Sequence, residues 1–165
     1  MQIDVNREIG APAARVWEII TDLPNSPAVM SAITRVDILE GADQFGVGTR
    51  WRETRTMFGR EASEVMSVSA LDPGRSYTVL AESHGTRYES TFEVIPAGEH
   101  ACVLRMTFAG EPTSPVSRVM SATVGRLFAG ATRKAVEQDL ADIAAAAEAG
   151  SGGTRGESGG RPVGP

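Results

Sequence analysis

Glu53 and Arg55 are the residues whose types and spacing most directly suggest chemistry. They lie two positions apart in the strand-like segment 49–58, so their side chains would share one face with Trp51 and Met57. The large apolar side chains at both ends of this face predict that it is turned inward. An internal carboxylate and guanidinium must pair with each other or contact the polar end of a ligand. In the second case they could orient the ligand and move protons to or from it.

A second interpretation of the same segment places both charges in solvent. A one-residue slip through a β-bulge would turn the following side chains of the strand to its other face. If the face is inward and the protein is an enzyme, the catalytic candidates are Glu53, Arg55 and Tyr88. If the face is outward, the pocket is apolar apart from Tyr88 and Ser90.

Other segments supply the remaining walls of a predicted ligand cavity. Alternation in 86–95 places Tyr88, Ser90 and Phe92 on one face, where the two hydroxyl groups can contact a ligand; a core tyrosine bonded to the backbone explains Tyr88 equally well. The methionines would adapt to an irregular ligand and are equally ordinary core residues. The full predicted set of ligand-binding residues is Trp51, Glu53, Arg55, Met57, Met66, Tyr88, Ser90, Phe92, Met106, Met120 and Leu127.

Signals for metal, nucleotide or nucleophile chemistry are weak. Cys102 is the single cysteine and lies in an apolar strand, which favours a buried thiol over a nucleophile. His84 and His100 fall at predicted turns without further ligands nearby, so no metal site is expected. The sequence has no G-x-S-x-G, Walker A or G-x-G-x-x-G motif. We therefore expect no metal and no cofactor.

One long helix must position these strands. The run 114–148 begins with Ser114 as a possible N-cap and Pro115 at the first helical position, and Gly150 is a plausible stop. Its apolar residues up to position 131, Leu127 among them, lie on one face, whereas Val136, Leu140 and Ile143 lie on another. The two stripes predict a bend or break within 125–130, where two glycines lie; one helix with a broad apolar face is the alternative.

The rest of the chain is expected to form an antiparallel sheet. The segment 2–9 alternates as a strand, and two short helical segments follow it directly, within 13–21 and 25–30. The turn-rich remainder predicts six more strands, at 33–39, 49–58, 60–71, 76–82, 86–95 and 100–108. Seven of the sixteen residues in 150–165 are glycine, so we expect a domain over 1–149 and a disordered tail over 150–165.

Four motifs carry a resemblance to a known family. They are Ala13 to Asp22 with its V-W-x-x-x-x-D pattern, Gly46-Val47-Gly48-Thr49-Arg50-Trp51, Leu71-Asp72-Pro73-Gly74-Arg75, and the final helix with Asp139-Leu140. Over residues 1 to about 149 the chain resembles the START-related superfamily, in particular its polyketide cyclase/dehydrase and lipid-transport members, also called SRPBCC or Bet v 1-like proteins. The resemblance implies an α+β helix-grip fold: a seven-stranded curved antiparallel sheet around the C-terminal helix, with a deep cavity for an apolar ligand.

Composition narrows the function further. The net charge of −5 disfavours nucleic acid as a partner, and no apolar run reaches the roughly 18 residues that cross a bilayer. The chain starts with polar–apolar alternation rather than a signal-like segment, so we expect a cytoplasmic monomer or homodimer without stable membrane insertion. The favoured function is binding of a lipid, polyketide or other aromatic metabolite. The alternatives are a polyketide aromatase/cyclase and a protein-interaction module of toxin–antitoxin or quinone-binding type.

Overall fold

The computed structural model describes the backbone of residues 1–150 and their side chains except those of residues 116–126. The predicted tail beyond residue 150 and the predicted cavity residue Met120 lie outside this description. The elements in chain order are β1 (Gln2–Ile9), α1 (Ala13–Thr21), a 3-10 helix η1 (Leu23–Asn25), α2 (Ser26–Val29), β2 (Ile33–Glu40), β3 (Arg50–Met57), β4 (Arg60–Asp72), β5 (Ser76–Ser83), β6 (Thr86–Pro96), β7 (Cys102–Pro112) and α3 (Pro115–Ala149).

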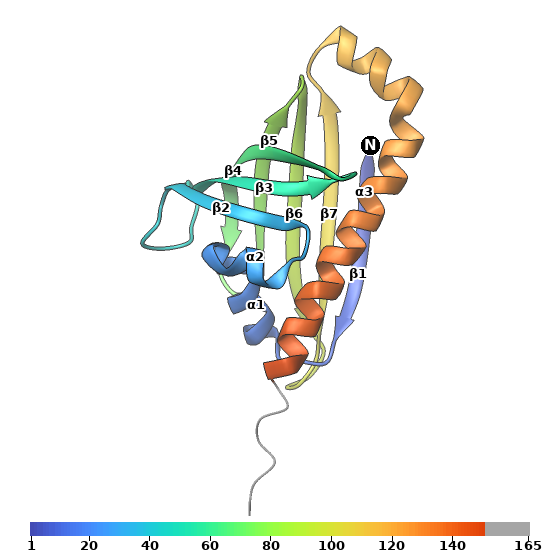
Figure 1. Ribbon diagram of the computed structural model, residues 1–165. Coiled ribbons are helices and arrows are strands. Elements are labelled where there is room, and N and C mark those ends of the chain that lie inside the picture. Colours follow the sequence, from blue (N-terminus) through green and yellow to red (C-terminus); the bar gives the residue numbers. More distant parts are fainter. Residues whose placement is uncertain (151–165) are drawn as a thin grey trace, which may run out of the picture.

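The strands form one seven-stranded antiparallel sheet in the order β1-β7-β6-β5-β4-β3-β2. Tight turns join several of the neighbouring strands, as between β4 and β5, where Pro73 precedes Gly74 with a φ of 76° that favours glycine. The sheet curves strongly, so that β2 and β3 cross in front of β5 to β7 (Figure 1). The predicted α+β helix-grip architecture is confirmed.

Helix α3 lies across the open side of the sheet, next to β1 and β7 (Figure 1). Val136, Leu140 and Ile143 are buried, so the second predicted stripe packs against the core, whereas most of the first stripe lies outside the described side chains. The helix is continuous from Pro115 to Ala149, and its ribbon changes direction in the upper, amber part of Figure 1. A bent helix therefore describes this course better than a broken one.

Strand β7 differs most from its predicted bounds, because it continues to Pro112 instead of ending at 108. Gly110 and Pro112 are usual signals for the end of a strand. Pairing with β6 nevertheless persists up to Thr86 opposite Pro112. A Cβ atom at Gly110 would lie 3.3 Å from the ring of Tyr88, so the glycine lets this ring pack against the strand backbone. Cross-strand packing thus overrides the local signal.

The short helices close the lower end of the curved sheet (Figure 1). Helix α1 packs on α3 and β6, and its Val16 and Ile20 side chains belong to the hydrophobic core. Cys102 is buried in the same core, as expected, and burial raises the pKa of its thiol. The described residues of α3 that line the internal space belong to the middle of the helix, so this space lies between the middle of α3 and the concave face of the sheet.

A cavity with a buried charged cluster

The space between α3 and the concave face of the sheet is a cavity of about 300 Å³. Its walls come from strands β2 to β7, from the short helices and from the described part of α3. Most of the lining side chains are apolar, and the charged ones are few. The lining residues are Ile20, Leu23, Ser26, Met30, Ile33, Trp51, Glu53, Arg55, Met57, Glu64, Met66, Tyr77, Val79, Ala81, Ser83, His84, Tyr88, Ser90, Phe92, Met106, Phe108, Phe128, Thr132, Ala135, Val136 and Asp139.

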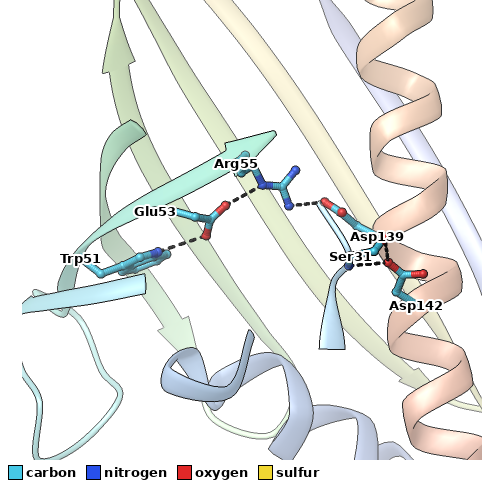
Figure 2. A network of polar contacts seen from close by, with 6 residues as sticks. All are labelled: Ser31, Trp51, Glu53, Arg55, Asp139 and Asp142. Carbon is cyan, nitrogen blue, oxygen red and sulfur yellow. Dashed lines mark hydrogen bonds and ion pairs between the residues drawn. The ribbon is translucent and has the colours of Figure 1, made fainter. Parts of the chain in front are cut away.

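Four of these side chains form a chain of polar contacts across the cavity, from β3 to α3 (Figure 2). Trp51 Nε1 donates a hydrogen bond to Glu53 Oε2 at 3.2 Å, and Arg55 Nε donates to Glu53 Oε1 at 2.7 Å. Arg55 Nη2 donates to Asp139 Oδ2 at 2.5 Å, which ties the end of β3 to the helix. We call Glu53, Arg55 and Asp139 the charged cluster.

The strand alternation places Glu53 and Arg55 inside, as the first interpretation of the sequence predicts. Strand β3 pairs with β4 without any shift of register from Arg50 to Met57, so its alternation is unbroken. The two irregularities in this part of the sheet lie between β2 and β3 and insert the extra residues on β2. The solvent-facing alternative is therefore wrong: the Glu53 residue is 8% exposed, and the Arg55 side chain is 21% exposed.

The charged cluster holds two carboxylates against one guanidinium. Burial acts to lower the pKa of Arg55, but the charges of Asp139 and Glu53 and their hydrogen bonds outweigh it and raise this pKa. Burial also raises the pKa of Asp139, and Arg55 opposes this shift without cancelling it. With all three groups ionised, the cluster carries a net charge of −1. Arg55 is therefore firmly cationic, whereas Asp139 holds its proton more readily than an ordinary aspartate.

One fully buried acceptor of the cluster, Asp139 Oδ1, has no hydrogen-bond partner among the described residues. The other Asp139 oxygen accepts from Arg55, and both Glu53 oxygens accept from Trp51 and Arg55. Asp139 is 4% exposed and lines the cavity. A buried acceptor without a donor costs about 1–3 kcal/mol, and more when it is charged. The cluster therefore offers one carboxylate oxygen for a further hydrogen bond.

Aromatic rings form two groups along the cavity. Tyr77 packs between Phe45 and Phe92, with ring centroids 5.0 and 5.1 Å away, and its hydroxyl donates to the Ile20 carbonyl oxygen at 3.0 Å. Burial and the charge of Glu53 raise the pKa of Tyr77, so it is a neutral core tyrosine. Tyr88 stacks on Phe108 at 5.5 Å, and the wall also includes the exposed His84. No local pattern indicates the role of Tyr77, because its neighbours in the fold are distant in the chain.

Residues 1–148 match the profile of the family described as polyketide cyclase/dehydrase and lipid transport. The chain belongs to this family. No curated protein sequence matches it closely enough to add a more specific relative.

Solved structures agree with the family in fold. A protein from Thermus thermophilus is 20% identical, with a TM-score of 0.74 over 92% of this chain and 99% of its own. The aromatase/cyclase Zhui from a Streptomyces species is 16% identical, with a TM-score of 0.70; the match covers 94% of this chain and 98% of Zhui. Norcoclaurine synthase from Thalictrum flavum, in complex with dopamine and hydroxybenzaldehyde, is 16% identical, with a TM-score of 0.64. The match covers 94% of this chain and 89% of the synthase.

Most of the predicted cavity residues of this family member do line the cavity. Leu127 is the correction: it is 81% exposed and is not part of the wall, whereas the next residue, Phe128, is. On the described part of α3, the lining residues follow Phe128 at helical spacing through Thr132, Ala135 and Asp139, and Leu127 is turned about 100° away from this face. The predicted residues that line the cavity are Trp51, Glu53, Arg55, Met57, Met66, Tyr88, Ser90, Phe92 and Met106.

Asp139 is the functional candidate that sequence reasoning missed. It lies beside Val136, Leu140 and Ile143 on the buried stripe of the helix, and these three residues are all apolar. A carboxylate on the apolar face of a helix is costly unless it is paired, and this is the signal that marks it. Within the part of the chain that the structure describes, no three histidine, cysteine or acidic side chains gather as a metal site, and no helix is long and apolar enough to span a membrane.

A second polar contact joins the segment before β2 to the helix, one turn from the charged cluster (Figure 2). The Ser31 backbone N–H and hydroxyl donate to Asp142 Oδ2 at 2.8 and 2.7 Å, and Gln138 donates to Oδ1 at 2.8 Å. Burial acts to raise the pKa of Asp142, but these hydrogen bonds outweigh it and lower this pKa. Because the pKa of Asp142 is lower in the folded state than in the unfolded state, its ionised form stabilises the fold at pH values above the unfolded-state pKa. This stabilisation is lost as pH falls through the folded-state pKa.

We therefore expect Asp142→Asn to lower the free energy of unfolding by about 1 kcal/mol at neutral pH, a value reduced for the partial exposure of the contact. The deficit should shrink as pH falls below the ordinary range of an aspartate, because the wild-type carboxylate is then protonated as well. Urea unfolding at a series of pH values measures both effects. A deficit that stays constant with pH would show that the charge of Asp142 does not matter for the contact.

Proposed function

We propose that the protein binds an apolar small molecule, such as a lipid, a polyketide or another aromatic metabolite, inside the cavity. The observation that carries this proposal is a mostly apolar internal cavity with a single buried charged cluster in its wall. Its volume is at the lower end of the roughly 300–1,000 Å³ typical of small-molecule sites, which combine apolar walls with a few polar groups. The family description and the shared fold support it.

Native mass spectrometry of the purified protein tests the proposal most directly. We expect a population heavier than the bare chain by the mass of a small apolar compound, which organic extraction should release. Added fatty acids or polycyclic aromatic compounds should produce the same kind of adduct in stripped protein. A chain that takes up none of these compounds would contradict the proposed function.

Trp51 provides an optical readout of binding. It is 3% exposed, lines the cavity and donates to Glu53. Trp17 is not among the lining residues and packs edge-on against Tyr77, with ring centroids 6.0 Å apart. An apolar ligand should therefore quench or shift the fluorescence of Trp51 and leave that of Trp17 nearly unchanged. We expect a clear titration curve in wild type and in Trp17→Phe, and a much smaller one in Trp51→Phe. A larger response from Trp17 would place the ligand outside this cavity.

A second candidate function is an aromatase/cyclase that acts on a poly-β-ketone in the same cavity. The observation that favours it is the charged cluster, because a pure carrier needs no buried acid with a raised pKa and a free oxygen. In this case Asp139 would transfer the proton, since both oxygens of Glu53 are already engaged. Arg55 and Tyr88 would orient the carbonyl groups. One solved structure of similar fold is an aromatase/cyclase.

A further inference from the structure

We propose that the ligand is an apolar compound with a hydroxyl group, a phenol or an alcohol, and that this hydroxyl donates a hydrogen bond to Asp139 Oδ1. This inference rests on the proposed binding function and adds to it the chemistry of the ligand's polar end. It has two bases: Asp139 lines the cavity and carries a buried oxygen without a donor among the described residues, and the other three carboxylate oxygens of the charged cluster already accept hydrogen bonds.

The first basis is the position of Asp139. It lies on the face of α3 that continues the cavity wall from Phe128 through Thr132 and Ala135. Its Oδ2 atom is held by Arg55 Nη2, which fixes the carboxylate and leaves Oδ1 without a donor among the described residues. The oxygen is fully buried, so bulk water does not solvate it. A ligand hydroxyl would supply a charge-assisted hydrogen bond at this point.

The second basis is the number of hydrogen bonds that the cluster still needs. Three of the four carboxylate oxygens of Glu53 and Asp139 accept from Trp51 or Arg55, and only one accepts nothing from the described residues. A hydroxyl has one proton to donate, so it matches one free acceptor. An ammonium group carries three N–H donors, and two of them would have to find acceptors elsewhere in a mostly apolar cavity. A ketone or an ether has no proton to donate to the carboxylate.

A non-specific apolar pocket would bind molecules of similar shape equally well, whereas the proposed site should prefer the one that carries a hydroxyl group. Isothermal titration calorimetry can compare para-hexylphenol with its methyl ether, with para-hexylacetophenone and with para-hexylbenzylamine. In wild-type protein we expect the phenol to bind about tenfold or more tightly than the methyl ether, which is the scale of one hydrogen bond to a charged group. The ketone and the amine should bind no better than the ether.

Asp139→Asn tests the same atom from the protein side. The asparagine carbonyl oxygen can still accept from Arg55, and its amide group then presents N–H donors to the cavity instead of a carboxylate oxygen. The preference for the phenol over the ether should fall to about twofold or less. Asp142→Asn is the matched control, because it removes the same charge one turn along α3 from a residue that does not line the cavity. It should leave the preference unchanged.

The outcomes separate the inference from the function on which it rests. Equal affinity for the phenol and the ether in wild type would overturn the hydroxyl assignment and leave apolar binding intact. Tighter binding of the ketone would show that the cluster presents a donor, from Arg55 or from a protonated Asp139, rather than an acceptor. Tighter binding of the amine would show that the cluster selects a cation. Either result overturns the inference. If none of the four probes binds, the proposed function fails together with it.

Discussion

Replacing Arg55 with methionine is expected to lower the free energy of unfolding by about 3–5 kcal/mol at neutral pH, the cost of breaking a buried ion pair from one side. Methionine keeps much of the length of the arginine side chain but removes the only cation that Glu53 and Asp139 contact in the charged cluster. Two buried carboxylates would then face each other without compensation. Urea unfolding followed by circular dichroism measures the change.

The pH dependence of this variant gives a second check. Arg55 opposes the burial that raises the pKa of Asp139, so its removal should raise that pKa further. When the pKa of Asp139 is higher in the folded state than in the unfolded state, its protonated form adds stability at pH values below the unfolded-state pKa. This stability is lost as pH rises through the folded-state pKa. The deficit of Arg55→Met should therefore be largest near neutral pH and should shrink toward about pH 4.

Arg52→Met is the matched control on the same strand. Arg52 is exposed, on the opposite face of β3 from the cavity, and we expect its replacement to change the free energy of unfolding by no more than about 0.5 kcal/mol. Similar deficits in the two variants would mean that loss of arginine itself, and not the charged cluster, explains the effect. A deficit below about 1 kcal/mol for Arg55→Met would show that the cluster contributes no more than a surface pair.

Asp139→Asn is expected to have the largest functional effect if the protein is an aromatase/cyclase. Turnover of a poly-β-ketone should then fall by about 10²–10⁴-fold, because asparagine keeps the shape but cannot exchange a proton. The fold should be retained, since burial raises the pKa of this aspartate and the ionised form therefore costs stability at neutral pH. Formation of the aromatic product, followed by its absorbance, measures turnover; binding of the substrate should be largely kept.

Glu53→Gln distinguishes proton transfer from support of the cluster. The side-chain amide of glutamine has one oxygen, so its –NH₂ group must face either Trp51 Nε1–H or Arg55 Nε–H and leave one buried donor unpaired. We expect this variant to lose about 1–3 kcal/mol of stability and to lose turnover mainly through misplacement of Arg55. If Glu53→Gln instead abolished turnover with full stability while Asp139→Asn stayed active, proton transfer would belong to Glu53.

Local patterns in the sequence were sufficient to predict the elements and the inward faces of the strands. Side chains in a strand alternate with a period of two whatever the strand packs against, so Trp51 and Met57 favoured an inward orientation of Glu53 and Arg55 over the solvent-facing alternative. The turn at Pro73 and the start of α3 at Pro115 are equally local, because the proline ring restricts its own backbone. These features depend only on residues a few positions apart, and the structure confirms them.

Which residues meet across the cavity depends on tertiary packing. Sequence left open where a slip in the sheet would fall, and the pairing puts it on β2 and spares β3. The helix rotation is set by burial of Val136, Leu140 and Ile143, and a shift of one residue turns a helix by about 100°. This rotation brings Asp139 to Arg55 across 84 positions of sequence and leaves Leu127 in solvent. The site is therefore completed by a contact that no local pattern encodes, because it depends on how the helix packs.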